Sequence, residues 1–360
     1  MPASLDIARS FAENIRFSGE PENRSPQEGR EDASVQLGNI FSQHNLQISP
    51  AVTPSLASSL EQVFERLHIP SECVTAYVVP DPVIQATCFA SSTTDCVLSF
   101  TSGLVQLLDE PEFQFVAGHE IGHFLLSHGL VHQPEGPESL ESLMEQRARE
   151  ISADRIGFVA CKSLSCAIQS MMKTASGLPT DKLRFDVDSF LSQLREPSNA
   201  TFSVTQASTH PSILVRCRAV LWFSMSDYSL EHLNQESLDR IRKLDSQIER
   251  DLQRYVDRPA RDKIEKAKRN YALWRMVEQA FQDGEFDKKE QEVIASDFGR
   301  DALGKLIGLI DGLNKTEVEE VVRAKLSEAI GELHAILPES ADREIQTIGH
   351  SVLQKLTRRQ

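Results

Sequence analysis

Residues Gly118-His119-Glu120-Ile121-Gly122-His123-Phe124 read His-Glu-x-x-His, with apolar residues on both sides. These apolar residues recur at three- and four-residue intervals, which predicts a largely buried helix. Positions i and i+4 of a helix lie on one face, so His119 and His123 can direct two imidazoles at one metal ion. Glu120 lies beside the first of them, where its carboxylate can reach a metal-bound water. The pattern predicts a zinc peptidase centre with Glu120 as general base.

Such a centre needs a third protein ligand, and the nearest candidate is His128, five residues after His123. The metzincin pattern places a glycine three residues and a histidine six residues after the second histidine. This chain has Leu126 and Gly129 at those places. The metzincin arrangement is therefore disfavoured.

A second helical segment, expected from about residue 138 to residue 173, offers acids at i and i+4, Glu150 and Asp154. Acids on a solvated helix face usually pair with bases, and the nearby arginines allow that interpretation. The segment becomes apolar directly afterwards, which favours a helix that enters a core. We expect Glu150 to be the third ligand and Asp154 to accept a hydrogen bond from a ligand imidazole.

Three motifs in this order resemble the HtpX/Oma-type zinc metallopeptidases, which are gluzincins of metallopeptidase family forty-eight. The resemblance covers about residues 50 to 225 and implies one Zn²⁺ per chain, held by His119, His123 and Glu150. It also implies an α+β fold, mainly helical, with a small sheet whose edge strand faces the active site. The motifs are Gly-His-Glu-Ile-Gly-His at 118–123, Arg147-x-x-Glu150-x-x-x-Asp154-Arg-x-Gly, and Thr209-His210-Pro211-Ser212 followed by Arg216.

Two strands are expected in this region, at Val74–Val79 and Cys96–Thr101. In the resembled family, the strand ahead of the zinc helix is the sheet edge on which the substrate backbone lies, through main-chain hydrogen bonds. The family commonly has Asn-Ala-Phe in this region, whereas this chain has Thr87-Cys88-Phe89, so any role of that asparagine is lost or altered. The expected substrate-binding residues are Val97, Leu98, Ser99 and Phe100.

His210 allows two interpretations. It can belong to an ordinary capped helix start, with Pro211 in the first turn. The family resemblance implies instead that His210 faces the zinc and stabilises the oxyanion, or binds the zinc and closes the site. We expect a catalytic role near the zinc, and we expect Arg216, on the following helix, to support the ligands.

Composition limits the alternatives. The net charge of −15 disfavours nucleic acid and anionic lipid as partners. The six cysteines form no Cys-x-x-Cys pair and the N-terminus has no secretory signature, so we expect reduced thiols and a soluble cytoplasmic protein. No run of about eighteen apolar residues is present, so no membrane span is expected, in contrast to the membrane-embedded members of the resembled family.

Three regions are expected along the chain. Residues 1–33 are predicted to be a disordered tail, because a weak amphipathic stretch is followed by a segment too polar to pack. Residues 34–227 are predicted to form the peptidase domain. Residues 228–360 are predicted to form an α-helical bundle. Its Asp283-Gly284-Glu285 junction resembles the tellurite-resistance TerB-type module, although a generic bundle fits as well.

The sequence thus predicts a zinc-dependent endopeptidase acting on protein or peptide substrates, either active or latent, with a regulatory partner bound through residues 228–360. The competing interpretation is a catalytically silent, zinc-stabilised scaffold that acts through its helical module. The intact Glu120 argues against a scaffold, because a structural zinc site has no use for a base at that position.

Overall fold

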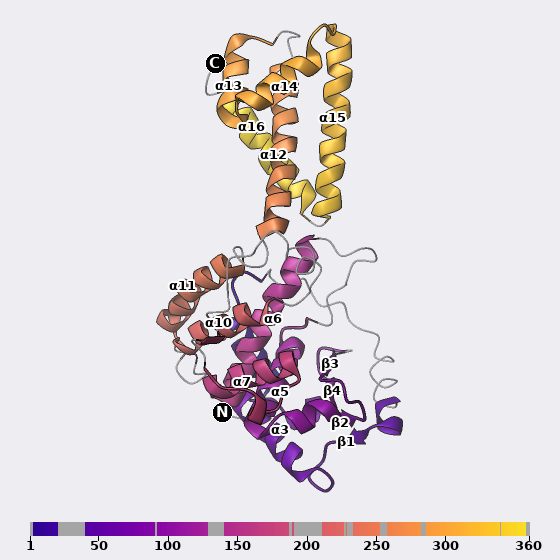
Figure 1. The fold of residues 1–360 in the computed structure, drawn as a ribbon, viewed down its shortest axis with the longest axis vertical. Coiled ribbons are helices and arrows are strands. Elements are labelled where there is room, and N and C mark those ends of the chain that lie inside the picture. The colour runs from indigo at the N-terminus through magenta and orange to yellow at the C-terminus, as the bar shows by residue number, and fades with distance from the viewer. Residues whose placement is uncertain are drawn as a thin grey trace. The chain divides into compact units, whose positions relative to one another are not determined.

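The computed structural model describes residues 3–20, 40–90, 92–128, 140–186, 189–190, 211–226, 228, 233–252, 258–281, 286–338 and 340–357. The chain divides into two compact units (Figure 1). Unit 1 comprises Met1–Gly136 and Leu143–Val256, and unit 2 comprises Pro137–Ser142 and Asp257–Gln360. Each unit is described by itself.

Unit 1 is mainly helical and contains one small mixed sheet, as an α+β fold requires (Figure 1). Its helices surround a core in which α5 and the sheet pack together. Two 3₁₀ turns, Ser71–Cys73 and Thr180–Lys182, also lie in this unit. Its α-helices include α1 (Leu5–Ile15), α3 (Pro54–Leu67), α4 (Ser102–Leu107), α5 (Glu110–Leu125), α6 (Leu140–Cys161), α7 (Leu164–Ser176), α10 (Ile213–Ser224) and α11 (Gln235–Leu252).

The sheet has the strand order β1-β2-β4-β3, formed by β1 (Leu46–Gln47), β2 (Val74–Val79), β4 (Cys96–Thr101) and β3 (Ala86–Ala90). β2 and β4 have the bounds that the sequence predicted, and they pair in parallel with Tyr77 opposite Ser99. β3 pairs antiparallel with the other side of β4, with Cys88 opposite Leu98. Side chains of β4 alternate between buried and half-buried, which turns Leu98 and Phe100 into the core.

α5 carries the His-Glu-x-x-His stretch and begins with a capping box. The Asp109 side chain accepts a hydrogen bond from the Glu112 N–H, and the Glu112 side chain accepts one from the Asp109 N–H. The helix is buried along most of its length. Phe113 packs on Phe100 of β4, with ring centroids 4.8 Å apart, and fixes the helix against the sheet.

Glycines let α5 and α6 approach unusually closely. A Cβ added at Gly118 would lie 2.3 Å from the Ala160 Cβ, and one added at Gly157 would lie 2.7 Å from the Phe115 carbonyl oxygen. Neither space accepts a side chain without movement of the helices. Because these glycines have no side chains, the two helices pack closely enough for the acidic residues of α6 to lie beside the histidines of α5.

The N-terminal region differs from its predicted disorder. Residues 5–15 form α1, which buries Ala8, Phe11 and Ile15 in the unit 1 core. The amphipathic stretch looked weak because it offers few apolar residues, yet those few are almost completely covered. The prediction of a tail at residues 1–33 is therefore wrong for residues 5–20, and residues 21–33 lie outside the described part of the chain.

The predicted domain boundary at residues 227/228 also differs from the division at residues 256/257. α11 is charged and amphipathic, like the bundle that follows, but it packs on α10 and α1. Its Asp245 carboxylate forms a buried ion pair with Arg155 of α6, and Ile248 is fully buried. α11 therefore belongs to unit 1.

The helical segment predicted from residue 138 to residue 173 consists of two helices. α6 ends at Cys161, Lys162 adopts a left-handed backbone (φ 55°), and Ser163 caps α7 by accepting a hydrogen bond from the Cys166 N–H. Glu150 and Asp154 both lie on the first of these helices, as expected.

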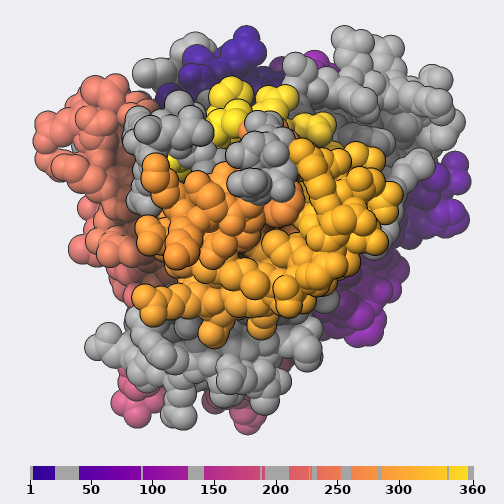
Figure 2. All heavy atoms as spheres, turned by 90° about the horizontal axis from the view of Figure 1, so that it is seen from above, coloured from indigo at the N-terminus to yellow at the C-terminus, as the bar shows by residue number. Residues whose placement is uncertain are grey.

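The described part of unit 2 is an all-α arrangement, whose surface is seen in Figure 2 in orange and yellow. α12 (Arg258–Ala280) packs against α15 (Lys315–Ile336) and α16 (Ala341–Thr357). α13 (Lys288–Phe298) and α14 (Arg300–Ile310) pack on each other. The junction used for the TerB comparison lies outside the described residues, so that comparison stays a prediction.

Candidate metal centre

Two helices bring three potential metal ligands together. α5 supplies His119 and His123, and α6 supplies Glu150. One ligand atom from each of these residues lies within 4.8 Å of the others. The two histidine Nε2 atoms are 3.1 Å apart, and oxygens of Glu150 lie 3.6 Å and 3.5 Å from the Nε2 atoms of His119 and His123.

These separations fit a metal ion. A tetrahedral ion with bonds of about 2.0–2.1 Å needs ligand atoms about 3.3 Å apart. Three protein ligands also leave the fourth tetrahedral position for water or substrate. The observed separations of 3.1, 3.5 and 3.6 Å lie close to that value, so the side chains need little movement to coordinate one cation.

The charges around the ligands fit a cation as well. Among the described residues, the buried carboxylates Glu150 and Asp154 share the guanidinium of Arg216, on α10. Arg216 donates from Nε and Nη2 to the two Asp154 oxygens at 2.8 and 2.6 Å, and its Nη1 lies 3.2 Å from Glu150 Oε2. Together with Glu120, the carboxylates exceed the guanidinium by two negative charges. A divalent cation would neutralise that excess.

Asp154 orients the first histidine. Its Oδ1 lies 3.0 Å from His119 Nδ1, so a proton on Nδ1 leaves the Nε2 lone pair directed at Glu150 and His123. Burial alone would raise the pKa of Asp154, but the Arg216 charge and hydrogen bonds outweigh it and hold this pKa below its usual value. Asp154 is therefore a charged acceptor for His119.

The two histidines titrate differently. Burial tends to lower the pKa of His119, but its hydrogen bond to Asp154 and the charges of Glu150 and Asp154 raise the pKa overall. Burial, together with the charge of His119, lowers the pKa of His123 well below its usual value. His123 is thus neutral at physiological pH, which is the form that binds a metal.

Glu120 has the environment of a general base. Burial raises the pKa of its carboxyl, assisted by the Glu150 charge, while His119 and a backbone hydrogen bond from Cys88 lower it in part. A carboxylate with a raised pKa is a better proton acceptor near neutral pH. Cys88 belongs to β3, and α5, the helix that carries Glu120, packs against β3.

Three residues lie behind His123, of which the sequence offered His128 only as a candidate ligand and did not indicate Glu20 or Ser152. His123 Nδ1 lies 2.7 Å from His128 Nδ1, and His128 Nε2 lies 2.9 Å from Glu20 Oε1. Ser152 donates a hydrogen bond to the other Glu20 oxygen. The five-residue spacing could have indicated His128 as a partner rather than a ligand. Nothing in the sequence indicates Glu20, which is 108 residues away from it.

The prediction that β4 is the edge strand that binds substrate is wrong. Val97, Leu98, Ser99 and Phe100 belong to β4, which pairs with β2 on one side and β3 on the other. Leu98 and Phe100 are also fully buried. A strand paired on both sides has no free main-chain groups for a peptide, and the free edge of the described sheet on this side is β3.

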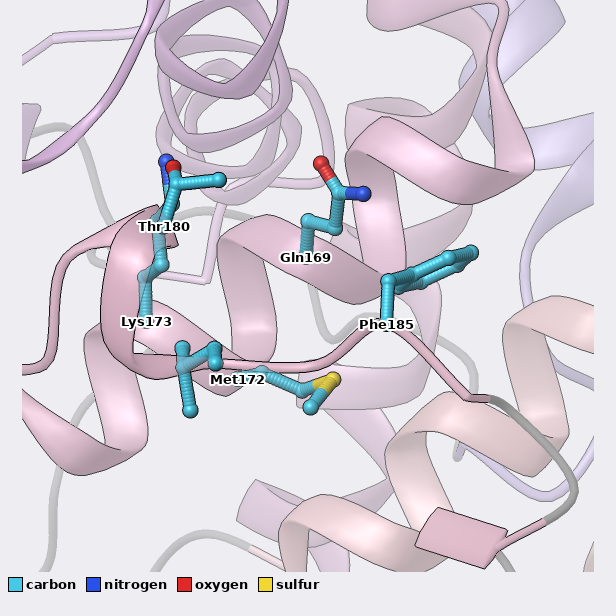
Figure 3. Close-up of a pocket in the computed structure, with 6 residues that line it drawn as sticks. Gln169, Met172, Lys173, Thr180 and Phe185 are labelled. Atoms are coloured by element: carbon cyan, nitrogen blue, oxygen red, sulfur yellow. The ribbon is translucent and has the colours of Figure 1, made fainter.

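The remaining sequence prediction, His210, lies outside the described residues. A surface pocket occurs elsewhere in unit 1, formed by α7 and the segment after it (Figure 3). Its Lys173 is ion-paired with Glu112 at 2.5 Å. None of the candidate metal ligands lines this pocket, which consists of Gln169, Met172, Lys173, Thr180, Leu183 and Phe185.

Comparison with known proteins agrees with this geometry. Residues 50–135 match the family model described as peptidase family M48. The chain is also similar to "Plastoglobule-localized metallopeptidase 48, chloroplastic" from Arabidopsis thaliana, with 26% identity over 208 residues. That match covers 49% of this chain and 60% of the relative, so the chain spans less than two thirds of that protein. No solved structure matches.

Both matches are to metallopeptidases and support a peptidase. The matched family segment contains His119, Glu120 and His123, and it ends before Glu150. Throughout the described residues, each helix is too short or too polar to cross a bilayer. The relative's name places that protein in chloroplast plastoglobules, and the cytoplasmic location of this chain stays a prediction.

Proposed function

We propose that this chain is a zinc-dependent endopeptidase. The observation that carries the proposal is the convergence of His119 Nε2, His123 Nε2 and the Glu150 carboxylate on one point beside Glu120. The match to peptidase family M48 supports the same assignment. A bound zinc ion would lower the pKa of water and polarise the scissile carbonyl.

Each side chain around this point has a distinct part. His119, His123 and Glu150 would hold the ion, and Asp154, bound by Arg216, fixes the His119 ring. The raised pKa of Glu120 favours its taking a proton from the attacking water. The same carboxyl group then delivers that proton to the leaving amine. His210 is proposed to stabilise the oxyanion, or to block the site in a latent form.

The substrate is proposed to lie along β3. Thr101 donates a backbone hydrogen bond to the Gln85 carbonyl, so the alternation of an antiparallel pair turns the main-chain groups of Ala86, Cys88 and Ala90 away from β4. Helix α5, which carries Glu120, packs against β3. An extended peptide added to this edge would pass the general base, through contacts that read backbone rather than side chains.

One experiment separates this enzyme from a silent scaffold. The full chain and its Glu120→Gln variant are incubated with casein and with a peptide library, with and without a chelator. The proposal predicts cleavage by the wild-type chain that is abolished by the chelator and restored by Zn²⁺. Variants lacking residues 257–360, which leave α11 in unit 1, and a His210→Ala variant, test whether latency hides the activity. Absence of cleavage by every form would leave the scaffold as the better account.

A further inference from the structure

The second metal-directed histidine, His123, has a buried partner on its far side. His123 Nδ1 faces His128 Nδ1 at 2.7 Å, and His128 Nε2 faces Glu20 Oε1 at 2.9 Å. His128 and Glu20 are 8% and 4% exposed, so water does not compete strongly for these contacts. The three side chains thus form a continuous hydrogen-bonded row that ends at the metal centre.

The direction of these hydrogen bonds follows from the ligand role. If His123 Nε2 binds a metal, its only ring proton is on Nδ1, which donates to His128 Nδ1. His128 must then carry its proton on Nε2, which donates to Glu20. A carboxylate accepts this bond, and Ser152 donates to its second oxygen. Every donor in the row therefore has an acceptor, and each tautomer is fixed by the next residue.

The last acceptor comes from a distant part of the chain. Glu20 follows α1, and backbone contacts hold this segment against α6 and α11. Phe17 N–H donates to Ser152 Oγ at 3.1 Å, and Ser18 N–H donates to Asp245 Oδ2 at 3.0 Å. The Arg155 guanidinium donates to the Ile15 carbonyl at 2.9 Å. The segment is thus a fixed part of unit 1, able to hold a carboxylate in place.

We infer that His128 and Glu20 are positioning residues for the metal ligand His123, and that the N-terminal segment 5–20 is thereby part of the metal centre. This inference rests on the proposed function, because it assigns a direction to the row only when His123 binds a metal. Asp154 fixes His119 in the same manner, so each histidine ligand has its own buried support.

Zinc affinity tests the inference. Zn²⁺ is titrated against a competing chromophoric chelator in the full wild-type chain and in its His128→Ala, Glu20→Ala and doubly substituted forms. Loss of the partner of a ligand histidine weakens metal binding about 10- to 100-fold. Because Glu20 acts through His128, Glu20→Ala should have little further effect once His128 is replaced.

Two controls separate positioning from general loosening of the segment. Ile15→Val removes a methylene from a fully buried side chain of the same segment without touching the row, and Glu13→Ala changes an exposed side chain. Both are expected to bind Zn²⁺ within about threefold of wild type, well below the effect of a lost ligand partner. Thermal unfolding of each metal-free variant shows how much stability was lost.

A second readout needs no variant. Long-range ¹H–¹⁵N correlation spectra of the zinc-loaded wild-type chain, labelled at histidine, report which ring nitrogen carries the proton. The inference predicts protonation of His123 at Nδ1 and of His128 at Nε2 alone.

If the wild-type chain binds Zn²⁺, either of two results would overturn the inference. One is that both alanine variants bind Zn²⁺ as tightly as the wild type, and the other is that His128 carries its proton on Nδ1. A wild-type chain that bound no Zn²⁺ would overturn the proposed function as well. Weakening in Ile15→Val equal to that in Glu20→Ala would show a merely structural role.

Discussion

His119 Nδ1 lies 3.0 Å from Asp154 Oδ1, and this contact turns Nε2 of the same ring toward His123 and Glu150. The contact joins α5 to α6 across the place where glycines let the two helices approach. Helix packing, histidine orientation and the metal centre are therefore one structural arrangement, and changes to any of them should alter the others.

Glu120→Gln should retain zinc and lose peptidase activity. Gln has nearly the same shape but accepts no proton, and loss of a general base lowers kcat by about 10²- to 10⁴-fold. Zinc content and cleavage rate are measured on the same preparation. Glu110→Gln is the matched control, since Glu110 is an exposed residue at the start of the same helix. Equal activity of both variants would exclude Glu120 as the base.

Arg216→Gln should destabilise the chain strongly. Asp154 is fully buried, and the substitution leaves its charge without a guanidinium, which costs about 3–5 kcal/mol. Urea unfolding of the metal-free chain measures the loss. Arg218→Gln on the same helix breaks a single contact with Asp251, in which the arginine is more exposed than Arg216, and should cost less. Similar losses in both variants would contradict a special role for Arg216.

Gly118→Ala should weaken both the fold and metal binding. The new Cβ would lie 2.3 Å from the Ala160 Cβ, so the helices must separate, and overpacking of this kind costs about 1–3 kcal/mol. Separation also moves Glu150 away from the histidines. Unfolding and zinc titration measure the two effects. Gly304→Ala on α14, where nothing lies within 4 Å, should instead stabilise its helix by about 0.5–1 kcal/mol. An unaffected Gly118→Ala would show that the close approach is not needed.

The raised pKa of His119 predicts two pH dependences. In the metal-free chain, protonated His119 stabilises the folded state. This contribution to the free energy of unfolding is fully present below the usual histidine pKa of 6.5, and it is lost as the pH rises through the higher pKa that His119 has in the folded chain. Metal binding must displace that proton, so apparent zinc affinity should fall about tenfold per pH unit below the folded pKa. Unfolding and zinc titration at pH 5–9 test both, with His119→Gln as the reference. A pH-independent stability difference between the two chains would contradict the first dependence.

Local spacing predicts much of the centre. The i, i+4 separation of His119 and His123 sets their shared helix face, and the same separation sets that of Glu150 and Asp154. The strand bounds at residues 96–101 also follow from a local pattern, and in the structure Leu98 and Phe100 of this strand are buried while Val97 and Ser99 are half-buried. These features depend only on the geometry of one helix or one strand, which residues close in sequence determine.

Long-range pairing explains the errors. β4 is not an edge strand because β3 pairs with it. The residue pattern of β4 alone does not predict where β3 pairs. Glu20 reaches His128 only because α1 packs into the core, and its few apolar residues gave a weak signal. The charged, amphipathic sequence of α11 resembles that of the following helices. Its buried ion pair between Asp245 and Arg155 instead shows that α11 belongs to unit 1.

Zinc content shows whether His119, His123 and Glu150 together bind one metal ion. The wild-type chain, Glu150→Gln and Glu145→Gln are purified without chelators, and metal is measured by mass spectrometry against protein concentration. Glu145 lies on the same helix as Glu150 and pairs with Arg149, so its replacement leaves the centre intact. We expect one zinc per chain in the wild type and in Glu145→Gln, and a large loss of zinc in Glu150→Gln. A wild-type chain free of metal, or full zinc in Glu150→Gln, would contradict this expectation.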